Sequence, residues 1–423
     1  MGSGLSRTCA IILIGAAAIA LLAQAGGAEQ PTLEWTKPMG TFVQTSPIIN
    51  SNYLFVSTYD GHVYGLWAAT GVAQWSKNYT GAITATPSNS DWTLYFGTSS
   101  GILYVVDGVT GAVEWQFNAN ANVDCTPLLY NGLLIFGSDD GNVYAVSSVN
   151  QQLEWNYTVG SYVSSGLDAG DNTVYFGSQL GRLFAVDTTT GHARWSTLLG
   201  DPNATKVYAP ALYNGVVYVG TQDGYLYAVD TASGGVLWRY QMGGAAVSKP
   251  LCRPGYVYAG SQDGYVYALN TTTGELAWKL RTDGPVKATP GFGTGGLGAG
   301  VLYVASEDGN VYAVDAKFGG LPYWQYSTSK MLDSTPVVSA DHLYLAALDG
   351  SVFSLKLPGR LVLSTSTPSP VPTPAGGPAT ATPRPTPTLV PLPSQAATPS
   401  PLSPAAGLAG LAIAVFLLAR RRR

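Results

Sequence analysis

The sequence predicts an all-β protein, an eight-bladed β-propeller made of four-stranded antiparallel blades. Three observations support this fold class: tryptophans and turn glycines recur together about every 40 residues, the 423 residues include 51 Gly, 26 Tyr and 10 Trp, and only 11% of residues are charged. Aromatic residues favour strands, and glycines favour tight turns. The low charged share, with a net charge of −4, argues against nucleic acid as a partner.

The first 25 residues are typical of a secretory signal peptide. Arg7 precedes an apolar run over residues 10–23, and a small-x-small cleavage site, AQA, ends at residue 25. The run is shorter than the roughly 20 residues that a membrane-spanning helix needs. We therefore expect export of the chain, with residues 28–363 forming the propeller.

Eight of the ten tryptophans follow one spacing. They are separated by 40 residues four times, and then by 43, 40 and 46 residues. Eight turn glycines follow the same spacing, and a Tyr or Phe comes three residues after each of them. Such a period is typical of propeller blades. The spaced tryptophans are Trp35, Trp75, Trp115, Trp155, Trp195, Trp238, Trp278 and Trp324, and the glycines are Gly61, Gly101, Gly141, Gly181, Gly224, Gly264, Gly309 and Gly350.

Each unit is predicted to contain four short strands. In the sixth unit, alternating apolar and small residues lead into an Asp-Gly hairpin, a second run returns, and a Thr-x-x-Gly turn precedes the strand with the tryptophan. In five units an Asp or Asn stands before that turn, where its side chain can accept hydrogen bonds from the turn's own amides. These residues are Asp107, Asp187, Asp230, Asn270 and Asp315.

The ring is expected to close through a shared eighth blade. The last unit ends at Pro358 without a tryptophan, whereas Trp35 precedes the first complete unit. We therefore expect the N-terminal strand to complete blade 8, which leaves no open sheet edge between the two ends of the ring.

The C-terminal part predicts a tether to the cell surface. Residues 364–404 contain 13 Pro and 14 Ser or Thr, which is typical of an extended stalk. Residues 405–423 combine an apolar run with four final arginines, which predicts a membrane anchor or sorting tail whose end faces the cytoplasm. This tail resembles the archaeosortase-type sorting signals of prokaryotic surface proteins. We expect an exported protein anchored through its C-terminus.

The repeats resemble the PQQ-like (quinoprotein) repeat family of β-propellers, to which BamB-like proteins belong. The family's mark, Ala-x-Asp-x-x-x-Gly-x-x-x-Trp, stands here as AVDTTTGHARW at 185–195 and AVDTASGGVLW at 228–238. Residues 145–155 lack the Asp and the Gly, and residues 313–324 contain one extra residue, so altered outer turns are expected in those two blades. In the family this tryptophan packs between blades, so the resemblance implies that the eight spaced tryptophans dock the blades.

The family includes quinone-dependent dehydrogenases, so the resemblance raises an enzymatic alternative. Those enzymes hold their cofactor with a disulfide between adjacent cysteines, a Ca²⁺ ion, a catalytic Asp and a stacking Trp. Cys125 and Cys252 fall in different repeats and are expected to be buried thiols. The starts of the inner strands offer mainly Thr, Ser and apolar groups, with Lys249 as their only charge. We expect no catalytic residue, no cofactor and no metal site.

The remaining polar motifs are expected to be structural. His62, His192 and His342 lack metal-ligand spacing and are expected in exposed loops. The Gly-rich residues 291–300 are expected to form a long hairpin in blade 7 rather than a phosphate-binding loop.

Two tryptophans lie outside the regular spacing. Trp67 replaces the turn Asp of the first unit, and Trp92 precedes the second strand of blade 2. Both are candidates for contacting a partner, with burial between blades as the alternative. Sequons for N-glycosylation stand at Asn78, Asn156, Asn203 and Asn270.

The sequence thus favours a non-enzymatic, monomeric propeller at the cell surface that acts as a scaffold or binds a protein or polysaccharide. Two alternatives stay open: an oxidoreductase that depends on PQQ or a metal, and a BamB-like envelope protein assembly factor.

Overall fold

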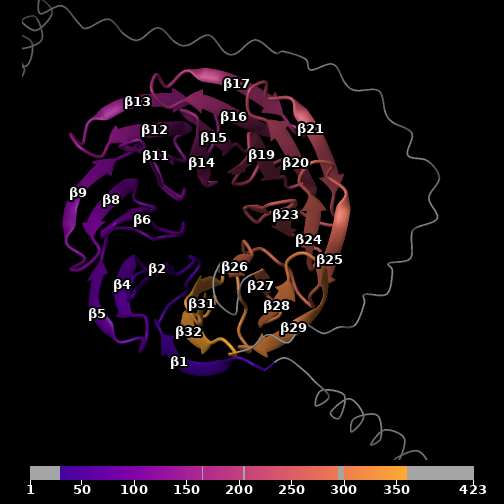
Figure 1. Ribbon diagram of the computed structural model, residues 1–423. Coiled ribbons are helices and arrows are strands. Elements are labelled where there is room, and N and C mark those ends of the chain that lie inside the picture. Colours follow the sequence, from indigo (N-terminus) through magenta and orange to yellow (C-terminus); the bar gives the residue numbers. More distant parts are fainter. Residues whose placement is uncertain (1–28, 164, 203–204, 294–299, 360–423) are drawn as a thin grey trace, which may run out of the picture. The chain divides into compact units, whose positions relative to one another are not determined.

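The computed structural model describes residues 29–163, 165–202, 205–293 and 300–359. Every named element among them is a β-strand, and the strands form eight four-stranded antiparallel sheets arranged in a ring (Figure 1). The predicted eight-bladed propeller is therefore confirmed. The predicted signal peptide, stalk and C-terminal tail lie outside the described residues. Among the residues that are described, none forms a helix that could cross a membrane.

The first four blades follow one another along the chain. Blade 1 contains β2 (Ile48–Asn50), β3 (Tyr53–Ser57), β4 (His62–Trp67) and β5 (Ala73–Asn78). Blade 2 contains β6 (Ser88–Ser90), β7 (Thr93–Gly97), β8 (Ile102–Asp107) and β9 (Val113–Asn118). Blade 3 contains β10 (Leu128–Tyr130), β11 (Leu133–Gly137), β12 (Asn142–Ser147) and β13 (Leu153–Thr158). Blade 4 contains β14 (Leu167–Gly170), β15 (Thr173–Gly177), β16 (Arg182–Asp187) and β17 (Ala193–Leu198).

The second half repeats this order, and its last blade takes one strand from the N-terminus. Blade 5 contains β18 (Ala211–Tyr213), β19 (Val216–Gly220), β20 (Tyr225–Asp230) and β21 (Val236–Gln241). Blade 6 contains β22 (Leu251–Arg253), β23 (Tyr256–Gly260), β24 (Tyr265–Asn270) and β25 (Leu276–Arg281). Blade 7 contains β26 (Gly291–Gly293), β27 (Val301–Ala305), β28 (Asn310–Asp315) and β29 (Gly319–Ser327). Blade 8 contains β30 (Val337–Ser339), β31 (His342–Ala346), β32 (Ser351–Lys356) and β1 (Thr32–Pro38).

The shared blade confirms the predicted ring closure. Strand β1 pairs antiparallel with β32, with Thr36 opposite Phe353 and Lys37 opposite Val352. Figure 1 shows the two ends of the described chain side by side in this blade. Since β1 forms the outer strand there, the N-terminal residues hold the last blade in the ring.

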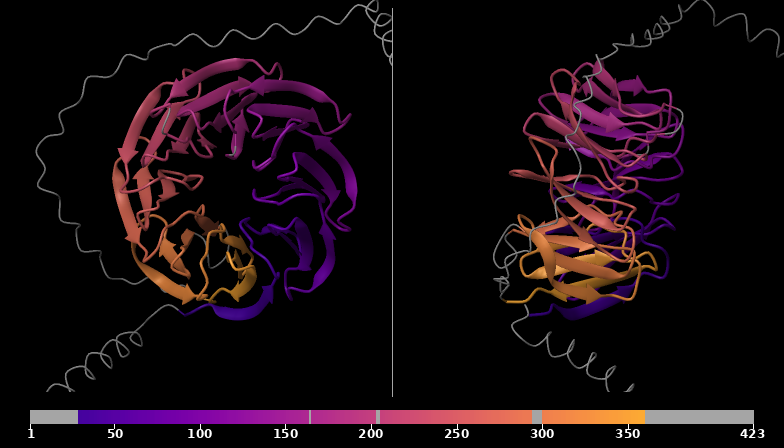
Figure 2. Two further views of the ribbon diagram at one scale, coloured as in Figure 1. Left: turned by 180° about the vertical axis from the view of Figure 1, so that it is seen from behind. Right: turned by 90° about the vertical axis from the view of Figure 1, so that its right-hand side faces the viewer.

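Within each blade the first strand lies nearest the centre of the ring and the fourth strand lies outermost (Figures 1 and 2). Consecutive strands are antiparallel, so alternate turns lie on opposite faces of the ring. One face, here named the turn face, carries the turns between first and second strands and between third and fourth strands. The other face, here named the connection face, carries the turns between second and third strands and the links between blades. The eight predicted turn glycines lie on the connection face, and all have positive φ, which glycine adopts at little cost.

The hydrophobic core consists of eight clusters, each between two adjacent blades. Blades 1 and 2 share Phe55, Trp75 and Phe96, for example, and blades 8 and 1 share Leu54, Val56 and Val352. The alternating apolar residues of the middle strands supply these clusters, because successive side chains point to opposite faces of a sheet. No blade can bury both faces alone, so the closed ring is the folding unit.

The outer turns differ from expectation in one of the two irregular blades. In blade 7 the inserted residue lengthens β29 and shifts its register against β28, as predicted. In blade 3 the prediction was wrong for the backbone. The Gln151 amide donates to the Ser147 carbonyl at 2.9 Å, as the turn glycines of other blades do, and Gln151 itself adopts φ +63°. A non-glycine residue thus takes the left-handed conformation there.

Candidate functional site

Trp67 and Trp92 come together on the turn face, on either side of Tyr53. Trp67 ends β4, Tyr53 begins β3, and Trp92 lies in the turn between β6 and β7 of the next blade. The Tyr53 ring lies 5.0 Å from the Trp67 ring at a tilt of 44°, and 5.5 Å from the Trp92 ring in an edge-on arrangement at 85°. The two tryptophans remain 38% and 40% exposed. We name these three residues the aromatic cluster.

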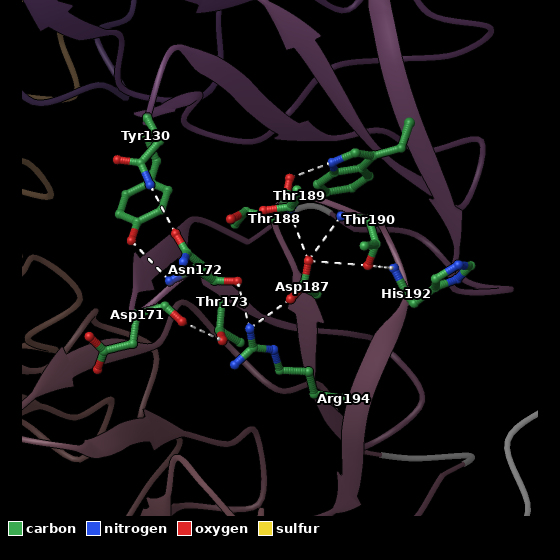
Figure 3. A network of polar contacts seen from close by, with 12 residues as sticks. Tyr130, Asp171, Asn172, Thr173, Asp187, Thr188, Thr189, Thr190, His192 and Arg194 are labelled. Atoms are coloured by element: carbon green, nitrogen blue, oxygen red, sulfur yellow. Dashed lines mark hydrogen bonds and ion pairs between the residues drawn. The ribbon is translucent and has the colours of Figure 1, made fainter.

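Trp67 occupies a position where other blades use a polar cap. In blade 4 the equivalent Asp187 accepts hydrogen bonds from the amides of Thr189 and Thr190, both at 2.9 Å, and pairs with Arg194 at 2.6 Å (Figure 3). The Arg194 hydrogen bond, helped by these amides, lowers the pKa of Asp187 to about 2. The predicted capping is confirmed in all five units, since Asp107, Asp230, Asn270 and Asp315 also accept turn amides.

Blade 1 has no such side-chain cap, because Trp67 stands at the capping position. Its turn is held by the Gly71 amide, which donates to the Trp67 carbonyl at 2.8 Å, while the Trp67 side chain lies against Tyr53. A residue that departs from a repeated local rule without a folding advantage is a candidate for function.

Trp92 departs from the repeat in a second way. At the equivalent turn position the other blades carry small or polar residues: Asn52, Gly132, Asn172, Gly215, Gly255, Gly300 and Asp341. The Trp92 carbonyl accepts the Gly108 amide at 2.6 Å, so its backbone keeps the common turn contact while its side chain stays exposed. Both departures therefore meet at one boundary between blades, where Figure 1 places β4 beside β6 and β8.

The rim of the cluster is polar. Asn50 donates from its side-chain amide to the Asp91 carbonyl, linking the turns of blades 1 and 2. Asn52 accepts the Ala68 amide at 2.8 Å through its carbonyl, while its side chain and that of Ser51 belong to an exposed turn. The turn residues 50–52, 67–72 and 88–92 contain no Lys or Arg, and Asp91 is their only charged residue. The turns that carry the three rings thus contain mainly amide and hydroxyl side chains, with one carboxylate and the exposed Val72.

The regularly spaced tryptophans differ from this pair because they reach into the neighbouring blade. The indole N–H of Trp75 donates to the Gly108 carbonyl at 2.9 Å, and that of Trp278 donates to the Ala316 carbonyl at 3.1 Å. Trp35, Trp155, Trp195 and Trp238 make the equivalent bond to Ala68, Thr188, Thr231 and Thr271. Trp115 and Trp324 lie at the same register against the third strands of their own blades. These contacts support the predicted docking role, which unfolding measurements have to test.

Among the seven inner-strand starts that contain a Pro, Lys249 is the only charge. The inner strand of blade 4 begins without that Pro, and it adds Asp168, which the sequence pattern did not reveal. Asp168 lies 3.2 Å from the Lys249 ammonium and accepts the Leu212 amide at 3.0 Å.

A second group of charges lies at the connection face. Lys287 pairs with Glu307 at 2.7 Å, and burial raises the pKa of the neighbouring Asp333 to about 6. Lys287 and Asp333 occupy the same position in their repeats. A buried Val or Leu precedes each of these inner strands, and the charged residue comes directly after it: Lys287 follows Val286, and Asp333 follows Leu332.

These charged residues of and beside the inner strands do not fit a quinone and calcium site of the kind that the family resemblance implies. Two of the carboxylates are already held by lysines, so a divalent ion would have to displace Lys249 or Lys287. Cys125 and Cys252 are buried free thiols, as predicted, and burial raises the pKa of each to about 12. Within the described part of the chain, no three His, Cys, Asp or Glu residues are grouped to hold a metal ion.

The histidines and sequons lie at several separate places. His62 and His342 begin strands and face carboxylates, so the expectation of exposed loops was wrong for both. Asn78 lies at the end of β5 and Asn156 is exposed in β13, whereas the Asn270 side chain caps its turn. Asn203 lies outside the described residues, as do residues 294–299 of the Gly-rich stretch between β26 and β27.

Comparisons with known proteins agree with the ring architecture. A repeat family described as outer membrane protein assembly factor BamB matches residues 22–116, 77–209, 205–292 and 286–362. Among solved structures, BamB from Moraxella catarrhalis is 21% identical with a TM-score of 0.66, covering 78% of this chain and all of that one. The quinohemoprotein alcohol dehydrogenase ADHIIG from Pseudomonas putida HK5 is 15% identical with a TM-score of 0.65, covering 81% of this chain and 78% of that one. No curated protein matches. At these identities the structures share the fold alone.

Proposed function

The chain belongs to the PQQ-repeat family that is described as outer membrane protein assembly factor BamB, and we propose that it is a non-enzymatic binding module. Its partner, a protein or a glycan, contacts the aromatic cluster. The observation that carries this proposal is the convergence of Trp67 and Trp92 on Tyr53 at the turn face. Two large aromatic side chains that stay about two-fifths exposed beside polar turns are suited to recognition.

The pairing of Asp168 and Glu307 with lysines supports a binding role over an oxidoreductase role. A quinone reaction needs a carboxylate that is available as a base, beside a cation that polarises the cofactor. Asp168 is held by Lys249 and by a backbone amide, and Glu307 is held by Lys287. Fold likeness to quinohemoprotein alcohol dehydrogenases does not transfer their chemistry, because function resides in the site and not in the fold.

We further propose that the propeller works outside the cytoplasm, exported by residues 1–25 and tethered through residues 405–423. The family supports an envelope location, since its description names an outer membrane assembly factor. A Pro-rich stretch between propeller and tail would act as an extended spacer between the propeller and the membrane.

A BamB-like role in envelope protein assembly is the second candidate. It is supported by the family match over most of the propeller and by the likeness to the M. catarrhalis protein across the whole of that chain. Such a role requires protein partners, so the partner's chemical class separates it from a glycan-binding role.

Pull-down with the full-length chain tests the proposal. Wild-type protein, the double variant Trp67→Ala/Trp92→Ala and the control Phe318→Ala are each incubated with envelope extract. Phe318 is 62% exposed in the outer turn of blade 7, so it matches the loss of an exposed aromatic away from the cluster. We expect the double variant alone to lose the captured partner. Equal capture by all three proteins would refute the role of the aromatic cluster.

A further inference from the structure

We propose that the aromatic cluster binds a neutral oligosaccharide, with sugar rings lying against Trp67 and Trp92. This inference rests on the proposed binding function and names the chemical class of the ligand.

The arrangement of the rings suits a ligand with alternating apolar and polar faces. Trp67 is tilted by 44° against Tyr53, whereas Trp92 meets Tyr53 edge-on at 85°. The two indoles are therefore held at different angles by one shared ring instead of stacking on each other. Each keeps surface free for contact. A pyranose ring presents an apolar C–H face of about the size of an indole, and burial of that face against the indole removes apolar area from water.

The turns beside the rings contain hydrogen-bonding groups for the hydroxyls of a sugar. Asn50, Ser51, Asn52 and Asp91 place amide, hydroxyl and carboxylate groups in the turns beside the rings. Side-chain amides can donate to and accept from vicinal hydroxyls, and carboxylates can accept from them. Because these turns contain no Lys or Arg and one Asp, an anionic polysaccharide is disfavoured and a neutral one fits.

The size of the cluster favours a glycan over a protein. A stable protein interface buries roughly 800 Å² on each partner around a buried apolar centre. Here the exposed apolar residues are few. They are the three rings, Val72 in the outer turn of blade 1, and Val109 and Val113 at the outer turn of blade 2, and the exposed polar residues Thr70 and Thr110 interrupt them along the chain. Carbohydrate ligands need only such a small apolar surface because each ring is recognised separately.

The cluster is also built on rigid elements. Tyr53 packs on the Phe55 ring at 5.9 Å, and Phe55 packs on Trp75 at 6.1 Å in the core between blades 1 and 2. Asn50 joins the turns of the two blades. The rings are thereby positioned before a ligand arrives, which reduces the entropy lost on binding.

Calorimetry with full-length protein tests the inference. The probes are cellohexaose, mannohexaose and maltohexaose as neutral ligands, an oligogalacturonate as an anionic ligand, and a peptide of residues 366–380 as a Pro-rich ligand. We expect at least one neutral hexasaccharide to bind, and the anionic ligand to bind at least tenfold more weakly. Trp67→Ala and Trp92→Ala should each weaken binding at least tenfold, Trp67→Phe should restore part of it, and Phe318→Ala should change nothing.

Several results would overturn the inference. Absence of binding by all three neutral hexasaccharides would do so, as would binding that is unaffected by both Trp variants, or binding of the peptide alone. If a protein partner is captured through Trp67 and Trp92 while no hexasaccharide binds, the proposed binding function stands and the glycan assignment fails. Melting curves of the variants confirm that lost binding does not reflect unfolding.

Discussion

The His342 imidazole Nε2 lies 2.8 Å from the Glu34 carboxylate Oε2, although 308 residues separate them in the chain. Glu34 belongs to β1 and His342 to β31, so the contact spans the blade that closes the ring. Asp341 faces the other ring nitrogen at 2.7 Å. These partly exposed pairs contribute little to stability by themselves. The hydrogen-bonded pairing of β1 with β32 is what keeps the ends together.

Removal of β1 should therefore open the propeller. Deletion of residues 28–36 exposes the edge of β32 and the apolar cluster between blades 8 and 1. We expect aggregation or a large drop in melting temperature, measured by calorimetry and size-exclusion chromatography. A shortened chain that melts like the intact one would refute the shared blade. Glu34→Gln serves as the control and should melt within a few degrees of wild type.

The regularly spaced tryptophans and the aromatic cluster should respond oppositely to truncation. Trp278 is 7% exposed and donates to the Ala316 carbonyl of blade 7, which also accepts the Tyr258 hydroxyl, so Trp278→Ala leaves a cavity and removes one of the two hydrogen bonds to this carbonyl. We expect a loss of about 3–5 kcal/mol in the free energy of unfolding, measured with denaturant. Trp92→Ala should cost less than about 1 kcal/mol, because its side chain is exposed. Similar losses for both would contradict the division between docking and binding tryptophans.

Asp333 should make stability depend on pH. Burial raises the pKa of its carboxyl from 3.8 to about 6, so the folded chain holds this proton more tightly than the unfolded chain does. The carboxyl therefore favours folding below pH 3.8, and that contribution is lost as the pH rises through 6. We expect Asp333→Asn to raise the stability at pH 8 by at least about 1 kcal/mol relative to wild type, with little difference at pH 3.5. The same gain at both pH values would contradict the raised pKa.

A quinone cofactor should not bind. Lys249 and Lys287 already pair with Asp168 and Glu307, so a calcium ion at either carboxylate would have to displace a lysine. We expect titration of the full-length protein with pyrroloquinoline quinone and Ca²⁺ to show no stoichiometric heat, and dye-linked assays to show no oxidation of alcohols or sugars. Tight binding of the quinone together with substrate oxidation would contradict the proposed binding module and favour the oxidoreductase alternative.

The sequence predicts the ring far better than it predicts the site. Spacing alone locates Trp35 in the blade completed by the N-terminus, because the repeats supply eight independent copies of one pattern. By contrast, Trp67 and Trp92 meet across a blade boundary, and Tyr53 joins them only through the three-dimensional packing of two turns. Departures from the repeat pattern identify Trp67 and Trp92 in the sequence, but nothing in the pattern identifies Tyr53, which contacts both. Asp168 was missed because the inner strand of blade 4 lacks the usual Pro.

Site-specific cross-linking in living cells tests the binding account most directly. A photoreactive amino acid replaces Trp92 in one variant and Phe318 in another, and both full-length chains are irradiated in intact cells of the native host. Both positions are exposed, but only Trp92 belongs to the aromatic cluster. The account predicts a discrete partner adduct from position 92 and none from position 318. Equal labelling from the two positions, or an adduct from position 318 alone, would contradict it.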